Sequence, residues 1–518
     1  MQIIIPMAGS GKRFTDEGYD TIKPLIRIEK KTMIEHVIEM FPKDADFFFI
    51  CSADHIKNTG LGEVLKKKAP RGEILTIKPH NLGPAYTVLS AGKKIDDDKP
   101  VIINYCDFKM DWSYSDFEKQ AARTKCDGAM TGYTGFHPHL LWGNKYAGMK
   151  VKNKKWLSGI KEKHCFTKNP ADSYHSAGTY YFKSGGEMKK YLSELMQKKM
   201  STNGEYYVST AFELLLLAGK KILVHEVKHF LQWGTPQDLQ EYVYWSNYFT
   251  QPQKEEKKNG FPGKTTLLVP MAGKGLRFSE TGYKTPKPLI TISGKPMFAH
   301  AVYSYPEAND QVFVCSKKHL KSKIDEKIRR LFPRAKIIVA QKTTGGQASS
   351  CLLAENEVDP ESSLLVIACD NKTIWSQRKF LGIIKDENVK AVIWTFRNNV
   401  AVKRKPKAYA YVKTSKNGEA LFVSCKKTIS GEPVKDHAVT GTFYFRKARH
   451  FFEAAKEMIR KNKRVNNEFY ADTVPNELIE KGGMAKVFEV DNYVVFGTPN
   501  DLKTYEYWEE YFKKRGKK

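Results

Sequence analysis

The sequence predicts an α/β protein made of two tandem copies of one domain, each with a mostly parallel central sheet flanked by helices. The first observation is a repeat: residues 3–25 (IIIPMAGSGKRFTDEGYDTIKPL) return as residues 267–289 (LLVPMAGKGLRFSETGYKTPKPL), with 13 of 23 positions identical. In each copy, apolar runs of strand character alternate with segments of helical spacing, which is typical of parallel βαβ units. Finally, a polar stretch punctuated by Pro and Gly separates the copies.

These observations set the expected domain boundaries. At 518 residues the chain is too long for one ordinary core. We expect domain 1 at residues 1–249, a linker at 250–264 and domain 2 at 265–518.

The elements of the first copy follow in order along the chain. Apolar runs at residues 3–5, 47–51 and 101–105 predict buried strands. Residues 33–40 between the first two runs have helical spacing. The second copy repeats this order, so we expect the same sheet twice.

Composition and charge exclude several classes of protein. A hydrophobic content of 41% with 12% aromatic residues is typical of a globular chain. No stretch reaches eighteen apolar residues and the first residues lead straight into a strand, so we expect no membrane insertion, no signal peptide and a cytoplasmic location. The net charge of +29 comes mostly from scattered lysines, whereas nucleic-acid faces cluster Arg with aromatics, so we expect no nucleic-acid partner. A solvated surface accounts for this charge, and attraction of anionic substrates or of an acidic membrane or partner is the alternative.

The repeated stretch has the features of a polyphosphate cradle. Glycines that directly follow a buried strand let the backbone approach a ligand closely, and successive N–H groups there form an anion nest. An Arg and, ten residues later, a Lys add positive charge at the same place in both copies. The candidate residues are Ala8, Gly9, Gly11, Arg13 and Lys23 in the first copy and Ala272, Gly273, Gly275, Arg277 and Lys287 in the second.

This pattern resembles the signature loop of the nucleoside-triphosphate transferase family, the sugar-1-phosphate nucleotidylyltransferases. That signature runs strand, G-x-G-x-R-[FL], about ten residues, then K-P-L, and both copies match it without a gap. The resemblance implies two tandem Rossmann-like nucleotidyltransferase domains. It also implies the reaction of an NTP with a phosphorylated acceptor, giving a nucleotide-activated acceptor and pyrophosphate. In this family Arg13 would hold the leaving pyrophosphate and Lys23 the α-phosphate, with Arg277 and Lys287 doing the same in the second copy.

A second glycine loop follows a predicted strand in each copy. Its residues are Gly83 and Ala85 in the first copy and Gly346 and Ala348 in the second, and each loop leads into a helix rich in small residues. By resemblance this loop lies against the nucleobase, which it reads largely through backbone groups. The alternative is a helix N-terminus that merely needs a tight turn.

Asp107 and Asp370 follow buried strands at equivalent positions. An acid at the carboxyl end of a central parallel strand lies at the ligand crevice of such sheets. Mg²⁺ is the expected partner because it is bound by one or two carboxylates together with substrate phosphates. Thymidylyltransferase relatives carry a second metal-binding Asp where this chain has Gln232 and Val495, which leaves a two-carboxylate site in doubt in both copies.

The later part of each copy resembles the acceptor half of the family. Lys163 and Lys426 would grip the acceptor phosphate, and Glu162 matches the family carboxylate that holds sugar hydroxyls. The copies differ here, because Glu162 corresponds to Cys425. The remaining candidates for acceptor binding are Gly178, Gly441, Glu205 and Glu468.

Three interpretations of the function remain open. Both halves could be enzymes for an activated sugar of surface-polysaccharide assembly, with a sugar 1-phosphate as acceptor. The acceptor could instead be a non-sugar phosphate such as phosphocholine, activated by a cytidylyltransferase. One half could also be a non-catalytic regulatory module. The exchange of Glu162 for Cys425 predicts that the halves differ in acceptor or that the second is slow, unless Cys425 simply packs and another residue binds the hydroxyls.

Overall fold

The computed structural model describes residues 1–143, 145–251 and 259–515. The chain folds into two compact units: the first contains Met1–Asn247 and the second Tyr248–Phe512. Part of the predicted linker, residues 252–258, lies outside the described residues. Among the residues that the structure describes, no helix combines the length and the apolar character needed to cross a membrane.

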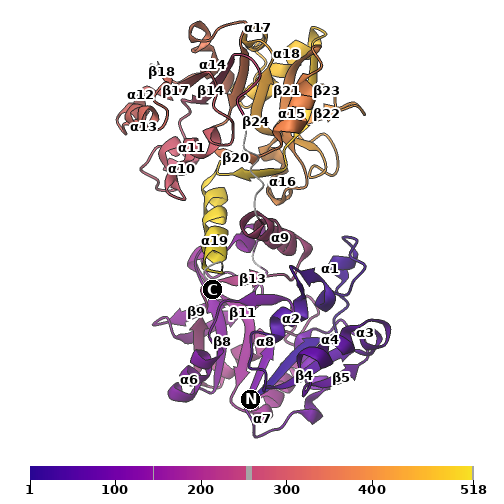
Figure 1. The fold of residues 1–518 in the computed structure, drawn as a ribbon. Helices are drawn as coiled ribbons and strands as arrows, with labels where there is room; N and C mark the ends of the chain where they lie inside the picture. Colours follow the sequence, from indigo (N-terminus) through magenta and orange to yellow (C-terminus); the bar gives the residue numbers. More distant parts are fainter. Residues whose placement is uncertain (144, 252–258, 516–518) are drawn as a thin grey trace. The chain divides into compact units, whose positions relative to one another are not determined.

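The first unit alternates strands and helices along the chain (Figure 1). Its strands are β1 (Gln2–Met7), β2 (Arg27–Ile28), β3 (Lys31–Thr32), β4 (Asp46–Ser52), β5 (Glu73–Ile77), β6 (Val101–Asn104), β7 (Phe108–Met110), β8 (Gly128–Tyr133), β9 (Gly148–Lys152), β10 (Trp156–Lys161), β11 (Tyr174–Phe182), β12 (Ile222–Glu226) and β13 (Phe230–Gln232). Its α-helices are α1 (Lys12–Thr15), α2 (Met33–Ile38), α3 (Ala53–Asn58), α4 (Leu61–Lys68), α5 (Pro84–Ser90), α6 (Tyr114–Thr124), α7 (Gly185–Gln197), α8 (Val208–Leu217) and α9 (Pro236–Thr250). Short 3₁₀ turns are η1 (Lys23–Leu25), η2 (Gly92–Lys94), η3 (Pro138–Trp142) and η4 (Pro170–Asp172).

The second unit repeats this sequence of elements. Its strands are β14 (Thr265–Met271), β15 (Thr291–Ile292), β16 (Lys295–Pro296), β17 (Asp310–Ser316), β18 (Lys336–Ala340), β19 (Ser363–Ile367), β20 (Asn371–Ile374), β21 (Val389–Phe396), β22 (Ala410–Thr414), β23 (Ala420–Cys425), β24 (His437–Phe445), β25 (Met484–Glu489) and β26 (Asn492–Val495). Its α-helices are α10 (Leu276–Ser279), α11 (Met297–Val302), α12 (Lys317–Leu320), α13 (Ile324–Leu331), α14 (Gln347–Leu352), α15 (Gln377–Ile384), α16 (Val400–Arg404), α17 (Ala448–Arg460), α18 (Val474–Glu480) and α19 (Pro499–Arg515). The 3₁₀ turns are η5 (Lys287–Leu289), η6 (Glu355–Glu357), η7 (Pro406–Ala408) and η8 (Ala471–Thr473).

The two sheets share one strand order over seven strands. In the first unit the order runs β5-β4-β1-β6-β11-β8-β12, and in the second it runs β18-β17-β14-β19-β24-β21-β25. The strands β5, β4, β1 and β6 pair in parallel, whereas β11 runs antiparallel to both of its neighbours, β6 and β8. β14 and β24 hold the corresponding places in the second unit. The sequence repeat is therefore a repeat of topology as well.

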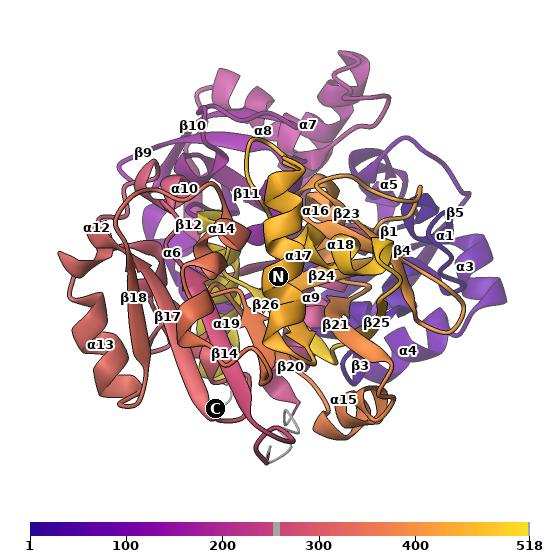
Figure 2. The ribbon, with the colours of Figure 1, turned by 90° about the horizontal axis from the view of Figure 1, so that it is seen from above.

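Helices cover both faces of each sheet, which explains why the strands read as unbroken apolar runs. Ile3 and Ile5 of β1 face a core formed with α2, α4 and α6, whereas Ile4 faces a core formed with α5, α7 and α8. In the second unit, Leu267 and Leu268 divide in the same way. Figure 2 shows α14 and α17 over one face of that sheet. The predicted α/β class with parallel-rich sheets flanked by helices is confirmed.

Candidate functional site

Two adjoining cavities open in the first unit beyond the carboxyl ends of β1 and β6. The first has a volume of about 350 Å³ and the second about 630 Å³. Arg13, Tyr105, Asp107, Tyr207 and Gly234 line both cavities, so the two spaces meet at these residues. This is the position at which open α/β sheets bind ligands.

Most of the residues predicted for the site of the first unit line these cavities. The predicted residues that line the first cavity are Ala8, Gly9, Gly11, Arg13, Lys23, Gly83, Asp107 and Glu205. Those that line the second are Arg13, Asp107, Glu162, Lys163 and Gly178. Segments as far apart in sequence as β1 and the end of β10 therefore contribute to one continuous site.

In each unit the glycine turn lies against the lysine of the Lys-Pro-Leu segment. Gly11 has φ +66°, a conformation that favours glycine, and a Cβ built on it would lie 3.6 Å from Lys23 Cβ. Gly275 has φ +62°, and its Cβ would lie 3.2 Å from Lys287 Cβ. In both units the turn and the Lys-Pro-Leu segment consequently close one compact loop after the first strand.

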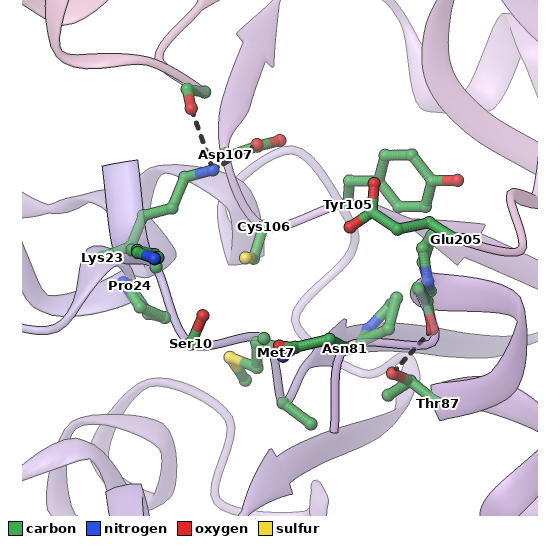
Figure 3. Close-up of a pocket in the computed structure, with 18 of the residues that line it drawn as sticks. Met7, Ser10, Lys23, Pro24, Asn81, Thr87, Tyr105, Cys106, Asp107 and Glu205 are labelled. Atoms are coloured by element: carbon green, nitrogen blue, oxygen red, sulfur yellow. Dashed lines mark hydrogen bonds and ion pairs between the residues drawn. The ribbon is translucent and has the colours of Figure 1, made fainter. Parts of the chain in front are cut away.

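An ion pair joins this loop to the neighbouring strand end. Lys23 Nζ lies 2.6 Å from Asp107 Oδ2 and donates to the carbonyl of Gly234 at 3.3 Å (Figure 3). Figure 3 shows this pair facing Tyr105 and Glu205 across the first cavity. In the second unit Lys287 donates to Asp370 in the same way. Burial opposes the charge of Lys287, but Asp370 and Cys369 outweigh it and raise the pKa of this lysine.

The second glycine loop is fixed by backbone packing. Gly83 has φ +89°, and a Cβ on it would lie 2.7 Å from both the backbone N and O of Tyr206. Gly346 has φ +137°, and its Cβ would lie 2.5 Å from the N and O of Phe469. Only glycine fits these positions, so the loop has a structural reason for its glycine besides any contact with a base.

The alanines of this loop, predicted to bind the nucleotide, are held by the protein backbone. Ala85 and Ala348 are fully buried, and their N–H groups donate to the carbonyls of Tyr206 and Phe469 at 3.0 Å. These N–H groups are therefore engaged within the protein and are not available to a nucleobase. Sequence reasoning missed His80, which lines the first cavity with its Nε2 3.0 Å from Thr87 Oγ1.

The surroundings of Asp107 fit a magnesium ion that also contacts substrate phosphates. A Cβ on Gly234 would lie 2.9 Å from Asp107 Oδ2 and 2.7 Å from Gln232 Nε2, so the glycine leaves space beside the carboxylate and this amide side chain. In the second unit, a Cβ on Gly497 would lie 3.3 Å from both Asp370 Oδ2 and Val495 Cγ2. Within residues 1–143, 145–251 and 259–515, no group of three or more His, Cys, Asp or Glu could hold a metal ion. Mg²⁺ suits a site with one carboxylate, because phosphate oxygens and water complete its octahedral shell.

The second cavity contains the predicted acceptor residues of the first unit. Glu162 follows β10 and accepts a hydrogen bond from Ser209 Oγ of α8, and burial raises the pKa of this carboxyl. Lys163 Nζ lies 3.9 Å from Glu205 Oε2 and 4.8 Å from the centroid of the Tyr207 ring. A carboxylate, a lysine and a tyrosine thus face one space, which suits a ligand with hydroxyls and a phosphate.

The second unit keeps the lysine of this arrangement but changes the carboxylate. Lys426 Nζ lies 5.3 Å from the centroid of the Tyr470 ring, as Lys163 lies over Tyr207. Cys425 Sγ donates to Asp472 Oδ2 at 3.9 Å. Asp472 was not predicted from the sequence as a site residue. Aligning the two copies places Asp472 at the position of Ser209, which is the hydrogen-bond partner of Glu162.

The remaining predicted residues of the second unit occupy equivalent places. Gly441 has φ +84° and accepts from the N–H of Ala368 at 2.9 Å, as Gly178 accepts from Tyr105 at 3.2 Å. Glu468 is exposed and forms a β-bridge with Val465, as Glu205 does with Thr202. The cradle residues Ala272 and Gly273 follow β14, and Arg277 lies exposed on α10.

Comparisons with known proteins give two solved structures and one family model to which parts of the chain are similar. The chain is similar to a nucleoside-diphosphate-sugar pyrophosphorylase from Vibrio cholerae RC9, with 21% identity, a TM-score of 0.39, and coverage of 46% of this chain and 98% of that one. It is also similar to the inositol-1-phosphate CTP transferase from T. maritima, with 15% identity, a TM-score of 0.37, and coverage of 48% and 96%. No curated protein sequence matches the chain. Residues 268–510 match the family model described as "Nucleotidyl transferase", so this family match falls on the second unit.

Proposed function

We propose that both units are nucleotidyltransferases, which transfer a nucleoside monophosphate from an NTP to a phosphorylated acceptor and release pyrophosphate. For the first unit the favoured acceptor is a sugar 1-phosphate. The observation that carries the proposal is the lysine–aspartate pair at the glycine turn, Lys23 with Asp107 and Lys287 with Asp370. In the first unit Asp107 lines both cavities and Lys23 lines the first, so the pair lies where the two spaces meet.

The first cavity suits the NTP. The N–H groups of the glycine turn and the side chain of Arg13 would bind the β- and γ-phosphates, since an anion nest beside a guanidinium favours polyphosphate. The loop at Gly83 lies at the same cavity, next to His80, and would receive the base. Asp107 would hold magnesium, which would neutralise phosphate charge when bound.

The second cavity suits the acceptor. Lys163 would bind the acceptor phosphate and Glu162 would accept hydrogen bonds from its hydroxyls. A phosphate oxygen of the acceptor attacks the α-phosphorus in line, and the bond from that phosphorus to the β-phosphate oxygen breaks. Lys23 would stabilise the charge on the α-phosphoryl group, so positioning and electrostatics supply most of the catalysis.

The retained pair in the second unit favours two active units over a regulatory second unit. A non-catalytic module has no need of a partly buried lysine beside an aspartate at the same turn, because such a pair costs desolvation. A product of this kind would supply activated precursors for polysaccharide or glycoconjugate synthesis in the cytoplasm.

The test is pyrophosphate release by the full chain with a panel of NTPs and phosphorylated acceptors in magnesium buffer. The panel should include sugar 1-phosphates, polyol phosphates and phosphocholine. Release that requires one NTP and one acceptor together supports the proposal. Release that is absent with every pair, or that ignores the acceptor, would overturn it.

A further inference from the structure

The two units hold different residues at one pair of equivalent positions whose side chains are in contact. In the first unit Glu162 follows β10 and Ser209 lies in the first turn of α8. In the second unit the equivalent positions, 263 residues later, hold Cys425 at the end of β23 and Asp472 in η8. Each pair contains one carboxylate and one short side chain, but the carboxylate has moved from the strand side to the helix side.

The contact across the pair is retained. Ser209 Oγ donates to Glu162 in the first unit, and Cys425 Sγ donates to Asp472 Oδ2 at 3.9 Å in the second. Ser209 is fully buried, whereas Asp472 is partly exposed, like Glu162, which lines the second cavity. In each pair the carboxylate residue is thus more exposed than the short side chain that donates to it.

Contacts connect Asp472 to Lys426, the predicted phosphate-binding lysine. Burial raises the pKa of the Asp472 carboxyl, the charge of Lys426 acts against this, and the charge of Asp370 adds to it. Cys425, which donates to Asp472, directly precedes Lys426, and Lys426 Nζ lies 5.3 Å from the centroid of the Tyr470 ring, two residues before Asp472. Burial and the nearby Asp472 charge raise the pKa of Cys425 to about 12, so this thiol stays neutral and accepts hydrogen bonds only weakly.

The wall of the second cavity also changes between the units. Tyr105 and Tyr180 line this cavity in the first unit, and their counterparts are Ala368 and Phe443. The second unit therefore lacks these two phenol hydroxyls and has a smaller side chain at the position of Tyr105. An acceptor that fits the first unit meets a different hydrogen-bonding pattern in the second.

We propose that Asp472 is the acceptor-binding carboxylate of the second unit, held in place by Cys425, and that this unit binds a hydroxyl-bearing phosphorylated acceptor different from that of the first. The inference rests on the proposed function and names the acceptor class of its second site. It takes up the alternative stated from the sequence, that Cys425 packs and another residue binds the hydroxyls. An acceptor without hydroxyls would leave the carboxylate unpaired and should be rejected strongly.

The test uses the full chain with the first unit silenced by Lys23→Met, so that pyrophosphate release reports the second unit. The acceptor panel compares sugar 1-phosphates and polyol phosphates with phosphocholine, which has no hydroxyl. We expect Asp472→Asn to raise the acceptor KM about tenfold or more while the KM for the NTP stays unchanged. Asp359→Asn, which removes an exposed carboxylate paired with Lys264 at 3.1 Å, is the matched control and should change neither value.

A double variant tests whether a loss of acceptor affinity reflects acceptor binding or a defect in folding. Asp472→Ser alone should lose acceptor affinity, and Asp472→Ser with Cys425→Glu should recover it and shift the acceptor preference towards that of the first unit. An unchanged acceptor KM in Asp472→Asn, or equal losses for NTP and acceptor without rescue, would overturn the inference while the proposed function stands. A silenced chain that turns over no pair at all would instead show that the second unit is not an enzyme, and both proposals for that unit would fall.

Discussion

Removal of Lys23 tests the catalytic assignment most sharply, because its surroundings allow the effect to be estimated. Lys23 Nζ lies 2.6 Å from Asp107 Oδ2, and the two side chains are 19% and 23% exposed. A unit charge about 4 Å from a phosphate oxygen is worth about 4 kcal/mol at an effective dielectric constant of about 20. Lys23→Met should therefore slow the first unit by roughly 10²–10³-fold, as the loss of one preorganised group typically does.

The same substitution should cost little stability. An exposed ion pair contributes about 0.2–1 kcal/mol and breaking a buried one costs about 3–5 kcal/mol, so the cost for this partly exposed pair lies between these limits, and methionine keeps the aliphatic part of the side chain. The fold of Lys23→Met should therefore persist in thermal unfolding monitored by circular dichroism. This separates a lost catalytic group from a lost fold.

The assay is pyrophosphate release by the full chain and three variants. Lys23→Met should remove only the activity of the first unit, and Lys23→Met with Lys287→Met should remove both. Lys31→Met is the matched control, since Lys31 also lies 2.6 Å from a carboxylate oxygen, that of Glu39, away from the cavities. A double variant that kept more than about a tenth of the wild-type rate would refute the reasoning.

Three further predictions follow from the same geometry. Asp107→Asn with Asp370→Asn should abolish the magnesium dependence of pyrophosphate release, and a magnesium titration that matches the wild type would leave these acids structural. Gly83→Ala should lower the melting temperature far more than Gly18→Ala, because both have positive φ but only the first places a Cβ 2.7 Å from backbone atoms, while the second has nothing within 4 Å; equal shifts would show that the loop relaxes. Burial lowers the pKa of His137 to about 3, below its ordinary value of about 6.5, so the folded state favours the neutral imidazole. The contribution of His137 to the free energy of unfolding is therefore complete above about pH 6.5 and is lost as the pH falls towards about 3. At pH 5 this contribution is reduced by about 2 kcal/mol. Urea unfolding at pH 7.5 and 5.0 should show His137→Phe to be less acid-sensitive than the wild type, and identical acid sensitivity would contradict this.

The repeat and the apolar runs were enough to predict the fold class. Ile3, Ile4 and Ile5 read as one buried strand, and the structure divides them between two cores on opposite faces of the sheet. The parallel strand ends then place the residues that follow β1 and β6 at one edge, which is why Lys23 and Asp107 were both expected at the ligand site; their ion pair was not predicted.

Long-range packing could not be predicted in the same way. The glycine at 83 was interpreted as a base-binding element, but its closest neighbour is the backbone of Tyr206, more than a hundred residues later. The exchange of Glu162 and Ser209 for Cys425 and Asp472 involves two positions of the repeat that are 47 residues apart, and only the contact between the partners shows that they belong to one pair.

The most direct test of the central claim is a ³¹P NMR time course of the full chain with the NTP and acceptor that the panel selects. If the units transfer a nucleotide to the acceptor, the α-phosphorus signal of the NTP and the phosphate signal of the acceptor should disappear together. A diphosphate-linked product and free pyrophosphate should appear in equal amounts, at a rate that Lys23→Met with Lys287→Met removes. Conversion of the NTP to a nucleoside di- or monophosphate with the acceptor signal unchanged would contradict this transfer.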